Sequence, residues 1–227
     1  MEKIFGISVH TESLQDQMGY DGVILLTYKI DYPQFVSDRF SAAAARLNLY
    51  YKAHALAFER YCRKRLFQTA VEQYEFDKGQ GYPAMTYEAE TAFEVTYNQN
   101  CAVSLRLDRY LFSGGAHGST HRYGDTWDLK TGRRMNLEQF FARGIDVKQY
   151  VVRQVTEQIE KQIQNGENYY FDNYEQNVAD ELNLEDFYLV PLGIMIFFQQ
   201  YAIAPYSSGM PEFLLPFIRG ISMPPHC

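Results

Sequence analysis

The sequence predicts an α+β fold, in which an antiparallel sheet carries a long N-terminal helix and further helices on one face. Three observations support this class. Apolar residues recur every three or four positions in two long stretches, they alternate with polar residues in several shorter ones, and turn residues separate the shorter stretches. Amphipathic helices need a surface to cover, and short turns between alternating stretches favour antiparallel pairing. We expect one domain of residues 1–227 with two packed sub-regions, about 1–110 and about 111–227.

The first sub-region begins with a strand and a long helix. Residues 22–30 (GVILLTYKI) are rich in β-formers, and Ser37 is a suitable N-cap for the helix that follows. An apolar stripe then runs from Phe40 to Ala70 at helical spacing. A helix of this length would reach about 50 Å at 1.5 Å per residue, so we expect a bend or a break in it.

A hairpin is predicted next, from residues 87–97 and 101–108, which alternate in polarity around the turn Asn98-Gln99-Asn100. The exposed face of the first strand carries Glu88, Glu90 and Glu94, which are placed to pair with arginines such as Arg106. Paired carboxylates also occur in glycosidases. Because these glutamates alternate on one strand face, we interpret them as a solvated surface.

The second sub-region combines short strands with two helices. Its predicted elements are a strand at 122–129 ending in the hairpin loop 130–132, a capping box of Asn136 with Gln139, a helix from Val147 to Ile163 closed by Asn165-Gly166, a short helix within 169–182, a hairpin of 187–190 with 194–198, a loop at 201–210 and a closing strand at 213–218. This order of elements supports the α+β class.

Composition excludes several classes of function. The formal net charge is −7, and the one basic cluster, Arg60–Arg65, falls on the helical pattern, so we expect no nucleic-acid partner. No apolar stretch is long enough to span a bilayer, and the N-terminus has no signal pattern. As written, the chain is therefore expected to be soluble and cytoplasmic.

The three cysteines, Cys62, Cys101 and Cys227, are odd in number and widely spaced. Cys62 lies on the apolar face of the predicted helix and Cys101 on a predicted strand, so we expect buried thiols and a reducing compartment. The tyrosine-rich composition, 19 Tyr and 16 Phe against one Trp, favours a half-exposed sheet, although it also suits a recognition surface.

The segment SGGAHGSTH (113–121) contains the most reactive side chains. His117 and His121 stand four residues apart, a spacing that binds metal on a helix, but the glycines make a helix improbable. A Ser–His hydrolase would need a strand–turn–helix context that is absent here. We interpret the glycines as turn chemistry between strands, with His117 holding the loop, and we predict neither a metal nor a cofactor. His117, Ser119 and His121 remain candidate ligand-binding residues, because loops on rigid sheets often carry function.

A second candidate surface is the loop APYSSG (204–209). Pro205 stiffens it, Tyr206 offers an amphipathic contact, and Ser207, Ser208 and Gly209 offer adaptable hydrogen bonding. Such a loop suits recognition of a protein or a glycan, whereas Tyr206 could equally cover the end of the sheet.

Three pieces in order carry a family resemblance: an N-terminal strand followed by a long helix, then "YLFSGGAHGSTHRYGDTWDLKTGRRMNLEQFF" (110–141), and then "FYLVPLGIMIFFQQYAIAPYSSGMPEFLLPF" (187–217). The chain resembles the bacterial family of unknown function shared by the extracytoplasmic part of anti-sigma factor RsiV and the non-catalytic region of peptidoglycan deacetylase PdaC. The resemblance implies an α+β fold and an extracytoplasmic binding role, and RsiV-type domains recognise lysozyme. This chain shows no transmembrane helix, no sigma-binding tail and no deacetylase domain, so the signalling role is not carried over.

The sequence therefore predicts a non-enzymatic binding domain whose partner is a protein, lysozyme-like in the relatives, or a peptidoglycan fragment. One alternative is a small hydrolase or metal-dependent enzyme centred on His117. Another is a cytoplasmic protein-interaction module.

Overall fold

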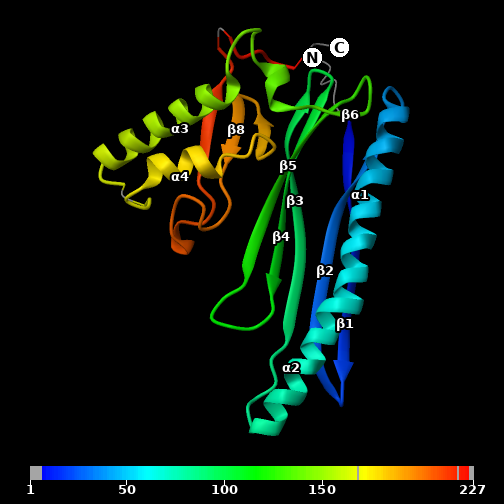
Figure 1. Ribbon diagram of the computed structural model, residues 1–227. Coiled ribbons are helices and arrows are strands. Elements are labelled where there is room, and N and C mark those ends of the chain that lie inside the picture. The colour runs from blue at the N-terminus through cyan, green and yellow to red at the C-terminus, as the bar shows by residue number, and fades with distance from the viewer. Residues whose placement is uncertain (1–6, 168, 219, 225–227) are drawn as a thin grey trace. The chain divides into compact units, whose positions relative to one another are not determined.

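The structure is a computed structural model that describes residues 7–167, 169–218 and 220–224 (Figure 1). The protein is of the mixed α+β class. Strands β1 to β6 form one mostly antiparallel sheet in chain order, and β7, β8 and β9 form a second sheet. The chain divides into two compact units. Unit 2 comprises Ile7–Phe93 and Leu107–His121, and unit 1 comprises Glu94–Arg106 and the described residues from Arg122 onward, so β3, β4 and β5 contribute to both.

Unit 2 consists of two long strands, a long helical segment and parts of three further strands. Its elements are β1 (Ser8–Tyr20), β2 (Val23–Val36), α1 (Ser41–Tyr61), a π-helical turn (Cys62–Leu66), α2 (Phe67–Gln80), and the nearer parts of β3 (Tyr87–Gln99), β4 (Ala102–Phe112) and β5 (Ser119–Asp128). The β1–β2 hairpin turns at Asp21 and Gly22, which both have positive φ. β2 pairs in parallel with β3, in a register that aligns Leu26 with Tyr87.

The helical segment packs on β2, as Figure 1 shows, because their apolar stripes face each other. Leu47 and Phe58 of α1 are buried, as are Leu26 and Ile30 of β2. Every second residue of a strand points to the same face, so β2 turns Leu26, Tyr28 and Ile30 toward α1. Burial of these side chains is the main apolar stabilisation of unit 2.

The long N-terminal helix is not confirmed, because the first helix begins at Ser41 after two strands. Ser37 does not cap it: the Ser37 hydroxyl accepts from the Phe40 amide at 3.1 Å, in a turn that precedes the helix. The expected break is present as the π-helical turn at Cys62–Leu66. β1 was missed because all of its side chains are exposed or only half-buried, so its sequence has no alternation of buried and exposed residues.

Unit 1 contains the second sheet and its two helices. Its elements are the remaining parts of β3, β4 and β5, then β6 (Arg133–Arg134), a 3₁₀ turn (Leu137–Phe140), α3 (Val147–Gln164), α4 (Tyr174–Glu181), β7 (Phe187–Val190), β8 (Gly193–Phe197), a second 3₁₀ turn (Tyr206–Ser208) and β9 (Glu212–Pro216). The predicted hairpins, the helix over 147–163 and the capping box of Asn136 with Gln139 are confirmed. The β3–β4 turn begins two residues later than expected, at Asn100, and Asn100 and Cys101 both have positive φ.

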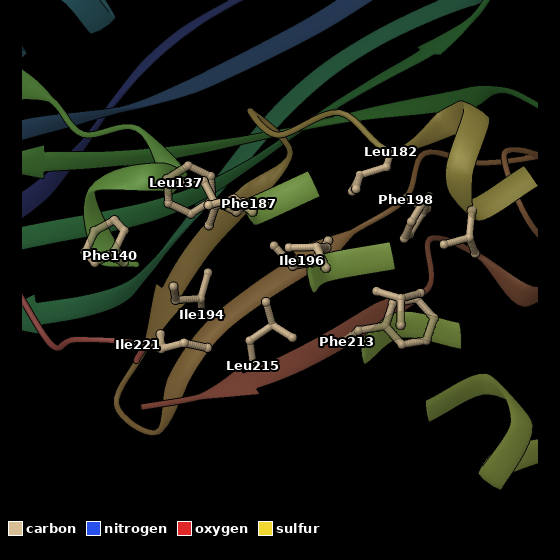
Figure 2. Close-up of a cluster of buried hydrophobic side chains, with 14 of the residues drawn as sticks. Leu137, Phe140, Leu182, Phe187, Ile194, Ile196, Phe198, Phe213, Leu215 and Ile221 are labelled. Carbon is tan, nitrogen blue, oxygen red and sulfur yellow. The ribbon is translucent and has the colours of Figure 1, made fainter. Parts of the chain in front are cut away.

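One apolar cluster forms the core of unit 1 (Figure 2). The buried face of α3, with Val151, Val155 and Ile159, contributes to the same cluster as Ile196 of β8 and Phe213 of β9. Glycine is required where strands approach closely: a Cβ on Gly124 would lie 1.8 Å from the Phe187 carbonyl oxygen.

A polar network lies beside this core and centres on Glu212. The Glu212 carboxylate accepts from the Tyr188 hydroxyl at 2.7 Å and pairs with Arg106 at 3.4 Å and with Arg122. Arg122 is buried, and the Glu212 carboxylate stabilises its charge there. Burial and the neighbouring carboxylate raise the pKa of Tyr188 well above its ordinary value, so its phenol stays protonated and donates.

The cysteines correct a sequence expectation. Cys62 is a buried free thiol as predicted, and burial raises its pKa to about 11. Cys101 is disulfide-bonded rather than a thiol, and its partner is not Cys62. The chain's third cysteine, Cys227, lies outside the described residues. The oxidised state of Cys101 was missed because the three cysteines form no CxxC pair or other spacing motif.

Within the described ranges, no helix is both long and apolar enough to cross a membrane.

Candidate functional site

Two segments of unit 1 meet to form a pocket of about 250 Å³, lined by Tyr169, Tyr170, Ser207, Ser208 and Pro211. One segment precedes α4, and the other is the loop between β8 and β9. None of the lining side chains carries a charge at neutral pH, so the pocket is an uncharged surface of rings and hydroxyl groups. We call it the tyrosine pocket.

Hydrogen bonds hold the two segments together. The Ser208 hydroxyl donates to the Tyr169 carbonyl oxygen at 2.9 Å, and the Phe171 amide donates to the Ile203 carbonyl oxygen at 3.1 Å. The loop between β8 and β9 is itself ordered by a 3₁₀ turn that follows Pro205. The pocket is therefore formed before a ligand arrives, which lowers the entropic cost of binding.

The tyrosines of the pocket have different roles. Tyr169 is 58% exposed, so its ring is available to a ligand. Tyr170 is half-buried against Tyr174 and Phe213, and its hydroxyl donates to Gln162. Burial raises the pKa of Tyr170 to about 12, so its phenol is neutral at physiological pH. Tyr170 thus supports the pocket wall while Tyr169 faces solvent.

A second pair of tyrosine rings lies on the loop between β8 and β9. Tyr201 and Tyr206 stand with their ring centroids 5.7 Å apart, and Tyr201 is 55% exposed. Because Tyr206 directly precedes Ser207, this pair continues the aromatic surface beyond the pocket. Exposed tyrosines that share a loop with serines are typical of recognition surfaces.

The sequence-predicted residues of this loop occupy neighbouring positions. Pro205 precedes the 3₁₀ turn, Tyr206 is half-buried against Tyr201, and Ser207 is exposed and lines the pocket. Ser208, the second serine of the predicted loop, also lines the pocket, whereas sequence reasoning missed Tyr169, Tyr170, Pro211 and Tyr201. The adjacent tyrosines at 169–170 were a signal, but nothing in the sequence shows that this segment meets residues 201–211.

The other predicted residues lie in unit 2, on the loop between β4 and β5 and at the start of β5. Gly114 and Gly115 have positive φ, which fits the predicted turn chemistry. His117 is exposed, and its Nδ1 lies 3.0 Å from the Gly118 carbonyl oxygen. This contact with the backbone is of the kind that holds a loop.

Ser119 and His121 are exposed on the same face of β5, since they are two residues apart on a strand. Gly118 separates them from His117 and packs against the Tyr110 ring. A Cβ at Gly118 would lie 2.3 Å from the Tyr110 ring. Across the described part of the chain, no three His, Cys, Asp or Glu side chains gather into a group that could hold a metal ion.

The glutamates of β3 behave as a solvated strand face. Glu88, Glu90 and Glu94 are exposed, and Glu94 pairs with Arg106 at 2.6 Å, as the alternation predicted. They do not converge on a pocket as paired catalytic carboxylates do, because strand neighbours on one face point in parallel directions.

Comparisons with known proteins agree with this architecture. A family profile described as deacetylase PdaC matches residues 24–120, and one described as a protein of unknown function, DUF3298, matches residues 138–217. None of the curated proteins matches the sequence.

Two solved structures share the fold over nearly the whole chain. A DUF3298 family member from Bacteroides fragilis NCTC 9343 is 18% identical with a TM-score of 0.71, covering 94% of this chain and 92% of the other. A DUF3298 family protein from Pseudomonas aeruginosa PAO1 is 19% identical with a TM-score of 0.60, covering 96% and 95%. At these identities the likeness shows the fold alone. The two profile matches, in chain order, confirm the resemblance found in the sequence: residues 24–120 are similar to the PdaC family and residues 138–217 to the DUF3298 family.

Proposed function

We propose that the protein is a non-catalytic binding domain that captures a cell-wall-derived glycan at the tyrosine pocket. The observation that carries this proposal is an uncharged, pre-formed pocket lined by Tyr169, Ser207 and Ser208, with Tyr201 and Tyr206 beside it. Sugar rings present apolar C–H faces and polar hydroxyl edges, and tyrosine and serine side chains complement both.

The size of the pocket limits what enters it. Pockets for drug-sized ligands occupy roughly 300–1,000 Å³, whereas this pocket measures about 250 Å³. A single sugar ring is therefore the expected occupant, and the rest of the chain would extend over Tyr201 and Tyr206. An uncharged lining offers no partner for a buried charge, so a neutral ring is favoured over an ionised one.

The disulfide supports the proposal that the protein functions outside the cytoplasm. Disulfides persist in oxidising compartments and are rare in the cytosol, and Cys101 is disulfide-bonded. A cell-wall ligand would be met in the same compartment. This proposal replaces the cytoplasmic location expected from the sequence.

Titration calorimetry with soluble, muramidase-released peptidoglycan fragments tests the proposal. We expect the native protein to bind, and Tyr169→Ala and Tyr206→Ala each to weaken binding by about tenfold, the loss of roughly 1.4 kcal/mol of ring contact. Tyr123→Ala, which removes an exposed tyrosine outside the pocket lining, is the matched control. Absence of binding by the native protein at high micromolar fragment concentration would contradict the proposal, as would equal losses in all three variants.

A second candidate function, protein binding, is favoured by one end of unit 2. Large apolar side chains are exposed there: Tyr20, Ile24, Phe76, Tyr82 and Met85. The segments that carry them are in contact, since the Thr86 hydroxyl donates to the Ile24 carbonyl oxygen at 2.9 Å, and a Cβ on Gly114 would lie 3.3 Å from the Met85 sulfur. The SGGAHG loop thus lies beside an exposed aromatic surface whose composition is typical of protein interfaces.

Lysozyme is the partner to test first, because RsiV-type relatives recognise it. Surface plasmon resonance should show binding by the native protein and at least tenfold weaker binding by the double variant Phe76→Ser/Tyr82→Ser. The matched control is Leu192→Ser, an exposed apolar residue of unit 1. If the native protein shows no lysozyme binding at high micromolar concentration, this second function is excluded for lysozyme.

A further inference from the structure

The outward side of α1 and the π-helical turn carries a row of positive charges. We define this cationic ridge as Arg46, Lys52, Arg60, Lys64 and Arg65, all of which are exposed. Residues 41–66 contain six Lys or Arg and a single Glu, although the whole chain has a formal net charge of −7. Positive charge is therefore concentrated on one helical segment of an otherwise acidic protein.

The ridge follows from helical periodicity. Leu47, Tyr51 and Phe58 form the buried stripe of α1, and Arg46 and Arg60 lie on the opposite side of the helix. The positions between the cations are filled largely by exposed alanines at 42, 45, 53 and 57. Small neighbours leave the long cationic side chains free to reach a flat surface.

Most of this charge is not used to hold the fold together. Arg63, the remaining cation of the segment, pairs with Asp16 at 2.5 Å and with Glu59 at 3.4 Å. Over the described ranges, Lys52, Arg60, Lys64 and Arg65 have no ion-pair partner. Because uncompensated cations repel one another, their concentration on one face suits an anionic partner better than it suits stability.

The other face of the same sheet has the opposite character. β2 turns Tyr28 toward α1, where its hydroxyl donates to Glu59 at 2.9 Å, and turns Lys29 away from the helix. Lys29 pairs with Asp31 at 2.8 Å and lies next to Glu90, in an open polar trough of about 600 Å³. Glu88 and Glu90 give this face excess negative charge. Unit 2 is thus electrically polarised, which would orient its helical face toward a negatively charged surface.

Two large apolar side chains stand among the cations. Leu49 is 73% exposed and Tyr61 is 42% exposed. A soluble anionic polymer would contact the cations alone, whereas a bilayer interface also accepts leucine and tyrosine at the level of its headgroups. The combination favours a membrane surface as the partner.

We propose that the cationic ridge of α1 attaches the protein peripherally to an anionic phospholipid bilayer. The helix lies along the surface, Arg60, Lys64 and the other ridge cations contact lipid phosphates, and Leu49 and Tyr61 enter the headgroup region. The attachment is electrostatic and reversible, because the apolar face of α1 is already buried on β2.

Vesicle co-sedimentation with the full chain tests this proposal. The native protein should bind vesicles of equal phosphatidylglycerol and phosphatidylcholine, bind little to phosphatidylcholine alone, and dissociate as salt rises above physiological strength. Arg60→Gln/Lys64→Gln should weaken binding roughly 25-fold, at about fivefold per cation. The matched control, Lys148→Gln/Lys161→Gln, removes two exposed cations from α3 and should bind as the native protein does.

Three results would overturn the proposal: equal loss of binding in both double variants, unchanged binding by Arg60→Gln/Lys64→Gln, or binding to soluble polyphosphate without binding to the vesicles. Leu49→Gln separates the membrane from a soluble polymer, since it should weaken vesicle binding and leave any polyphosphate binding unchanged. Circular dichroism of each variant verifies that the helix is intact.

Discussion

The candidate binding surfaces of the two units differ in charge and in how they are formed: unit 1 has an uncharged pocket and unit 2 has a cationic helix face. In unit 1, the tyrosine pocket is uncharged and requires two loops, more than thirty residues apart in sequence, to meet through bonds such as Ser208 to Tyr169. In unit 2, the cationic ridge requires only that residues 41–66 be helical. A pocket depends on tertiary contacts and is sensitive to the core beneath it, whereas a helix face depends on local periodicity.

The interiors of the two units also differ, because unit 1 has a polar network beside its apolar core. Unit 2 is held by an apolar stripe in which Leu47 and the thiol of Cys62 are fully buried. Unit 1 adds to its apolar cluster a polar network in which Glu212 binds Arg122 and Tyr188. Apolar packing tolerates small shifts, while a buried charge needs its partner in place. The interior of unit 1 should therefore depend more on single polar residues.

The largest expected effect is in unit 2. Leu47→Ala removes a fully buried side chain and should lower the free energy of unfolding by about 3–5 kcal/mol. Cys62 is the free thiol among the described residues, so its reaction rate with Ellman's reagent follows the opening of unit 2. The rate should rise by about a hundredfold or more in the variant.

Leu49→Ala, on the solvent side of the same helix, is the matched control and should change stability by no more than about 0.5 kcal/mol. If Leu47→Ala and Leu49→Ala accelerate the thiol reaction equally, the apolar stripe does not hold unit 2 together, and the contrast between the two interiors is wrong.

The next effect is on the network of unit 1. Glu212→Ala leaves Arg122 buried without its carboxylate, and we expect a loss of about 3 kcal/mol. This is the lower end for broken buried pairs, because the Glu212 side chain is 29% exposed and partly screened. The single tryptophan, Trp127, is buried in unit 1, so its fluorescence during urea unfolding measures this loss.

Glu160→Ala, which removes an exposed carboxylate from α3, serves as the control and should leave the urea midpoint nearly unchanged. A Glu212→Ala protein as stable as the control would show that the network contributes nothing, and that the two interiors are alike.

The smallest effect is local to α3. The Asp146 carboxylate caps this helix by accepting from the Gln149 amide at 3.0 Å. Asp146→Ala should cost about 1 kcal/mol in the Trp127 transition, and Asp146→Asn should recover most of it, because asparagine caps nearly as well. Equal losses in both variants would assign the effect to charge rather than to the cap.

The local elements of unit 1 were predictable because their signals are short-range. The capping box at Asn136 and Gln139, the Asn165-Gly166 helix end and the Pro191-Leu192-Gly193 turn act within a few residues, so the sequence contains the whole interaction. β1 was not predictable, because it has no such short-range signal. Its strand conformation comes from thirteen residues of pairing with β2, while its own side chains stay largely in solvent.

The same distinction between local and long-range interactions applies to the candidate site. Pro205, Tyr206 and Ser207 were found from the composition of one loop, and Ser207 lines the pocket. The pocket's other wall, Tyr169 and Tyr170, was missed because it is brought there by bonds such as Phe171 to Ile203, which no sequence spacing encodes.

The sequence by itself determined the α+β class, the family resemblance, most hairpins and helices, and the basic cluster Arg60–Arg65, since each rests on periodicity or on motifs of neighbouring residues. Only the tertiary structure decided which loops form the tyrosine pocket, which carboxylate pairs with Arg122, that Cys101 is oxidised, and which face of the long helix stays exposed, opposite the acidic face of the sheet. These features join residues distant in the chain, and contacts of that kind follow from how the core packs rather than from any local preference.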